Sequence, residues 1–86
     1  MDKILIIDDS PVQANFLSSI LTGDYEVAVV NTAEEGLEQA RVGDYSLILL
    51  DVIMPGIDGF QLLKMLQEEV VLRRIPVILI TSLNDI

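Results

Sequence analysis

The sequence predicts an α/β protein in which helices cover both faces of a parallel sheet. Three short runs made only of Ile, Leu and Val occupy residues 4–7, 47–50 and 77–80, as expected of strands buried on both faces. A fourth run, residues 26–30, includes a glutamate and suggests an edge strand. Segments with helical periodicity separate these runs. The order βαβαβαβ therefore indicates a doubly wound sheet with right-handed crossovers.

The first helix is predicted to start at Ser10 and Pro11, because serine caps helix N-termini and proline fits the first turn. Gly23 is its predicted stop. Its expected apolar face repeats every four residues and consists of Val12, Phe16 and Ile20, with Leu17 and Leu21 beside them.

The second and third helices carry their own start signals. Residues 32–35 have the pattern of a capping box, and Gly43 is the expected stop after an apolar face with Leu37 and Ala40. Asp58 is the expected N-cap of the third helix. The core stripe predicted for that helix consists of Phe60, Leu63 and Leu66, with Leu62 and Met65 adjoining it.

Composition excludes several classes of function. The formal net charge is −9 with only 5 Lys and Arg residues, which argues against binding to nucleic acid or to an anionic membrane surface. Cysteine and histidine are absent, so disulfides, thiolate metal sites and imidazole catalysis are excluded. The apolar N-terminal run is too short for a signal peptide or a membrane span. We expect one globular domain, residues 1–86, in the cytoplasm.

Four residues whose side-chain oxygens could bind a ligand stand at the carboxyl ends of the predicted strands: Asp8, Asp9, Asp51 and Thr81. In a parallel sheet the carboxyl ends of the strands share one edge, where ligands bind. Three neighbouring carboxylates repel one another unless a cation or a proton intervenes, and oxygen ligands favour a hard ion such as Mg²⁺. Taken alone, an aspartate at the end of a strand is ordinarily a turn former or a helix cap.

Three segments, "ILIIDDSP", "LILLDVIMPGIDGF" and "PVILITS", resemble the receiver domain of bacterial two-component response regulators, a flavodoxin-like fold. The resemblance covers essentially the whole chain and implies the strand order 2-1-3-4. It also implies a phosphoacceptor rather than an enzyme, with at most self-catalysed phosphotransfer and autodephosphorylation. The implied partner is a sensor histidine kinase or a phosphotransfer protein.

The resemblance assigns a role to each candidate residue. Asp51 would accept the phosphoryl group, and Asp9 and Asp51 would bind Mg²⁺ directly. Asp8 would act largely through a water, and the backbone carbonyl of Ile53 would complete the protein ligands. The switch hydroxyl would belong to Thr81, and the backbone N–H of Ser82 would contact the phosphoryl group.

One departure from the family pattern is expected to matter. The fourth helix, fifth strand and fifth helix of the family have no counterpart here, nor does its Lys-Pro pair, and Lys3 and Lys64 do not sit where that lysine belongs. The strand at residues 77–80 would then be an exposed edge, which favours a homodimer or an exchange of elements between copies.

Three alternatives stay open at this stage. A pseudo-receiver would act only through protein contacts. A phosphatase of the haloacid dehalogenase type would need a second acid at residue 53, where this chain has Ile53. A nucleotide-binding module would need glycine in the first strand-to-helix turn, which reads Asp8-Asp9-Ser10-Pro11.

Overall fold

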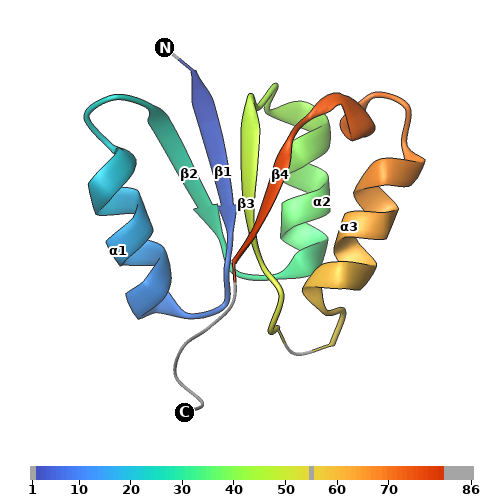
Figure 1. Ribbon diagram of the computed structural model, residues 1–86, viewed down its shortest axis with the longest axis horizontal. Helices are drawn as coiled ribbons and strands as arrows, with labels where there is room; N and C mark the ends of the chain where they lie inside the picture. The colour runs from blue at the N-terminus through green and yellow to red at the C-terminus, as the bar shows by residue number, and fades with distance from the viewer. Residues whose placement is uncertain (1, 55, 81–86) are drawn as a thin grey trace.

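A four-stranded parallel sheet forms the centre of the computed structural model, which describes residues 2–54 and 56–80. The strands are β1 (Lys3–Ile7), β2 (Glu26–Val30), β3 (Leu47–Asp51) and β4 (Val77–Ile80), in the order β2-β1-β3-β4 (Figure 1). The predicted fold class and strand order are therefore confirmed.

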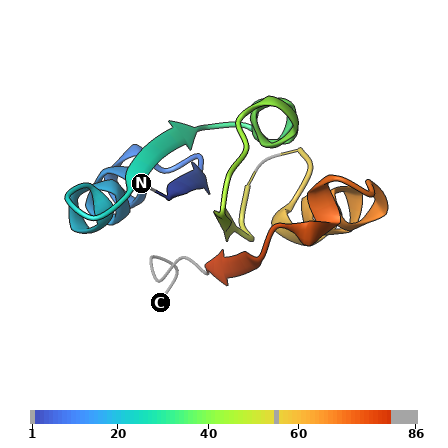
Figure 2. The ribbon, with the colours of Figure 1, turned by 90° about the horizontal axis from the view of Figure 1, so that it is seen from above.

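Three α-helices cover the two faces of this sheet. Helix α1 (Pro11–Leu21) lies on one face, and α2 (Ala33–Val42) and α3 (Gly59–Glu68) lie on the other (Figure 2). A short 3₁₀ helix, η1 (Leu72–Arg74), leads into β4 and was not expected from the sequence. No helix formed by the described residues combines the length and apolarity needed to span a bilayer.

Side chains of the inner strands divide between two cores, because successive residues of a strand point to opposite faces. The larger core, under α2 and α3, contains Leu5, Ile7, Ile48 and Leu50. The smaller core, under α1, contains Ile4, Ile6, Leu49 and Ala14. Both inner strands are thus buried on both faces, which explains their unbroken apolar composition.

The main stripe of the predicted apolar face of α1 is wrong. Val12, Phe16 and Ile20 are 80%, 64% and 59% exposed. The buried side consists of Ala14 with the partly buried Leu17 and Leu21, and the prediction had placed these two leucines beside the main stripe. Two apolar stripes run along this helix, and periodicity does not say which one faces the sheet. The small side chain of Ala14 fits close to the sheet, whereas the other stripe is left in solvent.

The predicted core stripe of α3 needs a similar correction. Phe60 is 63% exposed, whereas Leu62 and Leu66 are fully buried. Gly59 lies against the backbone that follows β3 and fixes the rotation of the helix. Residues 62, 63 and 66 share the side of Gly59, since they follow it by three, four and seven positions. Phe60 directly follows Gly59 in the sequence, so it lies on a different side of the helix and points away from the sheet.

Each predicted N-cap is present. The Ser10 hydroxyl accepts a hydrogen bond from the Gln13 N–H at 3.3 Å, and the Thr32 hydroxyl accepts one from the Glu35 N–H at 3.1 Å. The complete capping box belongs to the third helix, where Asp58 and Gln61 bond reciprocally. At Thr32 only the forward half forms, and its hydroxyl also donates to the Glu35 carboxylate at 3.3 Å.

The corrected face of α3 leads to a mutational prediction. Leu62→Ala should lower the free energy of unfolding by about 2–5 kcal/mol, because it opens a cavity in the larger core. Phe60→Ala should change it by no more than about 0.5 kcal/mol, as expected for an exposed position. Urea denaturation followed by circular dichroism measures both. A larger loss for Phe60→Ala than for Leu62→Ala would contradict the observed rotation of α3.

Candidate functional site

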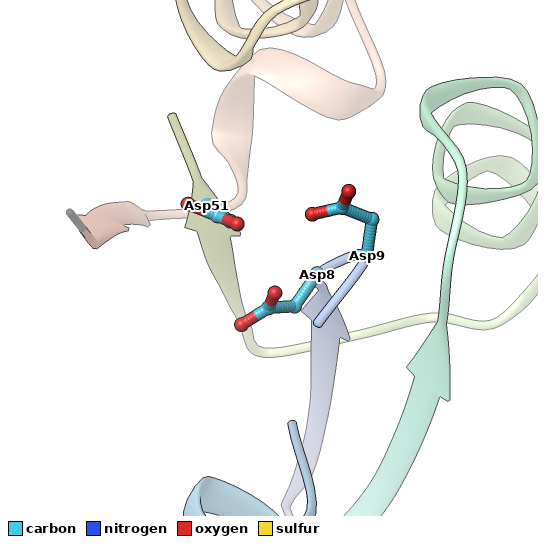
Figure 3. A group of neighbouring side chains, drawn as sticks. All are labelled: Asp8, Asp9 and Asp51. Atoms are coloured by element: carbon cyan, nitrogen blue, oxygen red, sulfur yellow. The ribbon is translucent and has the colours of Figure 1, made fainter. Parts of the chain in front are cut away.

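Three carboxylates converge at the carboxyl ends of β1 and β3 (Figure 3). Parallel pairing sets Ile7 beside Leu50, so the next residue of each segment, Asp8 and Asp51, lies beside the other. One oxygen each of Asp8, Asp9 and Asp51 lies within 4.8 Å of the others. Asp8 and Asp51 are only 1% and 2% exposed, whereas Asp9 is exposed. Two like charges are therefore buried together beside a third that faces solvent.

Hydrogen bonds from two elements fix Asp8. Its Oδ1 accepts from the Ser10 N–H at 2.9 Å, and its Oδ2 accepts from Gln13 Nε2 at 2.6 Å. The backbone N–H of Asp8 donates to the Val30 carbonyl at 3.0 Å, which joins the site to the end of β2. Asn31 Nδ2 donates to the Asp8 carbonyl at 3.4 Å. Asp8 is thus held rigidly at the end of β1.

Asp51 is fixed by the loop between β3 and α3. Its Oδ1 accepts from the Ile53 N–H at 3.1 Å. The Gly59 N–H donates to the Val52 carbonyl at 3.1 Å, so α3 begins directly against this backbone. A Cβ on Gly59 would lie 2.4 Å from Val52 Cα and 2.6 Å from the Asp51 carbonyl oxygen. Only glycine allows this close packing, which sets the position of the Asp51 backbone relative to α3.

Burial raises the pKa of Asp51 from its ordinary value of 3.8 to about 6. The hydrogen bond from the Ile53 N–H opposes this shift, whereas the neighbouring carboxylates of Asp8 and Asp9 reinforce it. Without a cation, the folded protein therefore retains a proton on Asp51 in mildly acidic solution.

The structure brings together the three acids that the sequence predicts at this edge and places Ile53 beside Asp51. Thr81 and Ser82 lie outside the described residues. Lys3 contacts the Gly43 carbonyl and lies 4.9 Å from the centroid of the Tyr45 ring, at the opposite end of the sheet.

Sequence reasoning missed Gln13, although its place in the first helical turn, five residues after Asp8, indicates a side chain directed back toward the acids.

The donor set fits a magnesium ion. All three side chains offer oxygen, and the structure describes no hydrogen bond to the Asp9 carboxylate within residues 2–54 and 56–80. Asp51 uses one oxygen for the Ile53 N–H, which leaves the other for a ligand. Mg²⁺ is commonly held by one or two carboxylates together with waters and phosphate oxygens, which suits a partly open cluster of this kind.

The sheet order and this cluster define a flavodoxin-like α/β domain with an acidic site at the carboxyl ends of its strands. The family model described as "Response regulator receiver domain" matches residues 4–86. The chain therefore belongs to the response regulator receiver domain family.

Three relatives illustrate the similarity. The response regulator PleD of Caulobacter vibrioides is 39% identical over 95% of this chain, which spans 18% of that protein. Protein PilH of Pseudomonas aeruginosa is 34% identical over 95% of this chain and 69% of its own length. The structure of the response regulator TrrA of Thermotoga maritima, in complex with Mg²⁺-BeF, superposes with a TM-score of 0.88 at 30% identity, covering 98% of this chain and 72% of that one.

The raised pKa of Asp51 predicts a dependence of stability on pH in the presence of a chelator. The unfolded chain releases this proton near pH 3.8, whereas the folded chain holds it until about pH 6. Stability is therefore lost as pH rises from the first value through the second, and the loss levels off once the pH is well above the folded-state pKa. Asp51→Asn should be more stable than the parent at pH 7 by about 2–3 kcal/mol, a difference that shrinks toward pH 4. Urea denaturation of both proteins across this pH range tests the prediction. A difference in the free energy of unfolding that is the same at every pH would contradict it.

Proposed function

We propose that residues 1–86 form one receiver domain, in which Asp51 accepts a phosphoryl group from a phosphohistidine on a sensor kinase or a phosphotransfer protein. The observation that carries the proposal is the buried Asp51 carboxylate, fixed by the Ile53 N–H and lying within 4.8 Å of the Asp8 and Asp9 oxygens. Membership of the receiver family supports the same reaction.

In the proposed reaction, a carboxylate oxygen of Asp51 attacks phosphorus. A P–O bond forms as the P–N bond to the donor imidazole breaks, and the imidazole takes up a proton. Hydrolysis of the acyl phosphate later returns the carboxylate and inorganic phosphate. The chain's contribution is to orient the nucleophile and exclude water from it, which the burial of Asp51 achieves.

Mg²⁺ is the proposed cofactor, and when bound it supplies positive charge that offsets the charge on the transferred group. Asp9 and Asp51 are its proposed direct ligands, with the Ile53 carbonyl. Both carboxylate oxygens of Asp8 already accept hydrogen bonds, which favours contact between Asp8 and Mg²⁺ through a water rather than directly. Thr81 and Ser82 are proposed to contact the phosphoryl group, as the family resemblance implies.

The alternatives that the sequence left open are less favoured. A pseudo-receiver has no need of two buried, adjacent carboxylates, which destabilise a metal-free domain. A phosphatase using residue 53 as an acid is disfavoured because Ile53 provides only backbone groups to the site.

A small phosphoryl donor tests the proposed reaction. With acetyl phosphate and Mg²⁺, intact-mass spectrometry should show one added phosphoryl group, and peptide mapping should place it on Asp51. Asp51→Asn should abolish the adduct, and chelation of Mg²⁺ should suppress it. Asp24→Asn, which changes an exposed acid in the turn after α1, is the matched control and should label like the parent. A parent adduct on any other residue would overturn the proposal.

We also propose that the edge strand β4 pairs with a second copy of this chain. Within the described sheet β4 contacts only β3, and Ile78 is 52% exposed on it. Light scattering should show a mass that rises with concentration for the parent and falls toward that of a monomer for Ile78→Lys. Val29→Lys, on the opposite edge strand, is the control and should behave like the parent. A parent that stays monomeric over a wide concentration range would contradict this proposal.

A further inference from the structure

The side chain of Gln13 reaches the acidic site from α1, and the proposed reaction gives it no role. Gln13 lies in the first turn of α1 and is half-buried. Its Nε2 donates to Asp8 Oδ2 at 2.6 Å, a short hydrogen bond to a charged acceptor. Asp9 and Asp51, by contrast, receive no side-chain amide within the described residues.

This hydrogen bond completes the set of donors around Asp8. The Ser10 N–H already binds Oδ1, and this bond alone would leave the carboxylate free to tilt about it. With Gln13 on Oδ2, both oxygens are fixed and the plane of the carboxylate is set. Asp8 is only 1% exposed, so no bulk water replaces a lost donor there.

Gln13 is itself held in place by the packing of α1. Its backbone N–H is bound by the Ser10 hydroxyl at 3.3 Å, which fixes the start of the helix. Leu17 and Leu21 follow it at four-residue spacing and pack on the smaller core. The amide therefore projects toward Asp8 from a rigid element rather than from a loop, as an orienting residue requires.

We propose that Gln13 is a positioning residue that orients the Asp8 carboxylate toward a bound divalent cation. This inference rests on the proposed function, since it takes the acidic cluster as the magnesium site. Partners of this kind hold metal-binding groups in a productive orientation, and their loss typically weakens metal binding by about 10- to 100-fold. A purely structural role for Gln13 would instead affect folding and leave the affinity for metal unchanged.

Calorimetric titration of the 86-residue chain with Mg²⁺ separates these two roles. Gln13→Met removes the amide and keeps a long unbranched side chain, and we expect its Mg²⁺ dissociation constant to rise by about 10-fold or more. Asn15→Met, an exposed amide on the same helix, is the matched control and should bind like the parent. Equal affinities for the two variants would overturn the inference and leave the proposed function standing.

A double-mutant cycle shows whether Gln13 acts through Asp8. In an Asp8→Asn background, Gln13→Met should change the dissociation constant by less than about twofold, because the carboxylate that it orients is gone. A full-sized effect in that background would overturn the inference. If the parent itself does not bind Mg²⁺ at millimolar concentration, the magnesium site of the proposed function fails, and this inference fails with it.

A measurement on the parent keeps the inference testable even if Gln13→Met does not fold. In ¹⁵N-labelled protein, the side-chain amide resonance of Gln13 should shift on titration with Mg²⁺, whereas that of Asn15 should not. The shift should be lost in Asp8→Asn. A Gln13 resonance that does not move while Mg²⁺ binds would overturn the inference.

Discussion

The main physical constraint on this structure is the burial of two carboxylates, Asp8 and Asp51, at the ends of neighbouring parallel strands. Each is almost inaccessible to solvent, and one oxygen of each lies within 4.8 Å of the other. Buried like charges are unfavourable unless donors, a proton or a cation compensate them. The backbone N–H groups of Ser10 and Ile53, the amide of Gln13 and the raised pKa of Asp51 are all forms of this compensation.

The surrounding helices are placed so that this arrangement is rigid. Gly59 lets α3 begin directly against the backbone of Asp51 and Val52, which a larger residue would prevent. On the other face of the sheet, α1 starts at the Ser10 cap immediately after Asp8 and Asp9. The two cores thus support the site from opposite faces of the sheet. Neither of the two buried acids, Asp8 and Asp51, is carried by a flexible loop.

Comparison of α1 and α3 with the sequence pattern shows where periodicity stops being informative. In α1 the pattern allows two apolar stripes, and the contact of Ala14 with the sheet decides between them. In α3 the presence of a helix and its cap at Asp58 follow from the sequence, but Phe60 lies in solvent because Gly59 turns the helix. Both errors concern rotation about the helix axis, which is fixed by contacts with the sheet and not by spacing along the chain.

The sequence by itself determined the strands, the order of elements, the helix caps and the candidate acids, because unbroken apolar runs and capping residues act locally. Their meeting at one edge also follows, since parallel strands carry their carboxyl ends on the same side. Only the tertiary structure decided which acids are buried, that the pKa of Asp51 is raised, and that Gln13 contacts Asp8. These properties depend on the depth of each group below the surface and on the rotation of α1, and both are set by packing between elements distant in sequence.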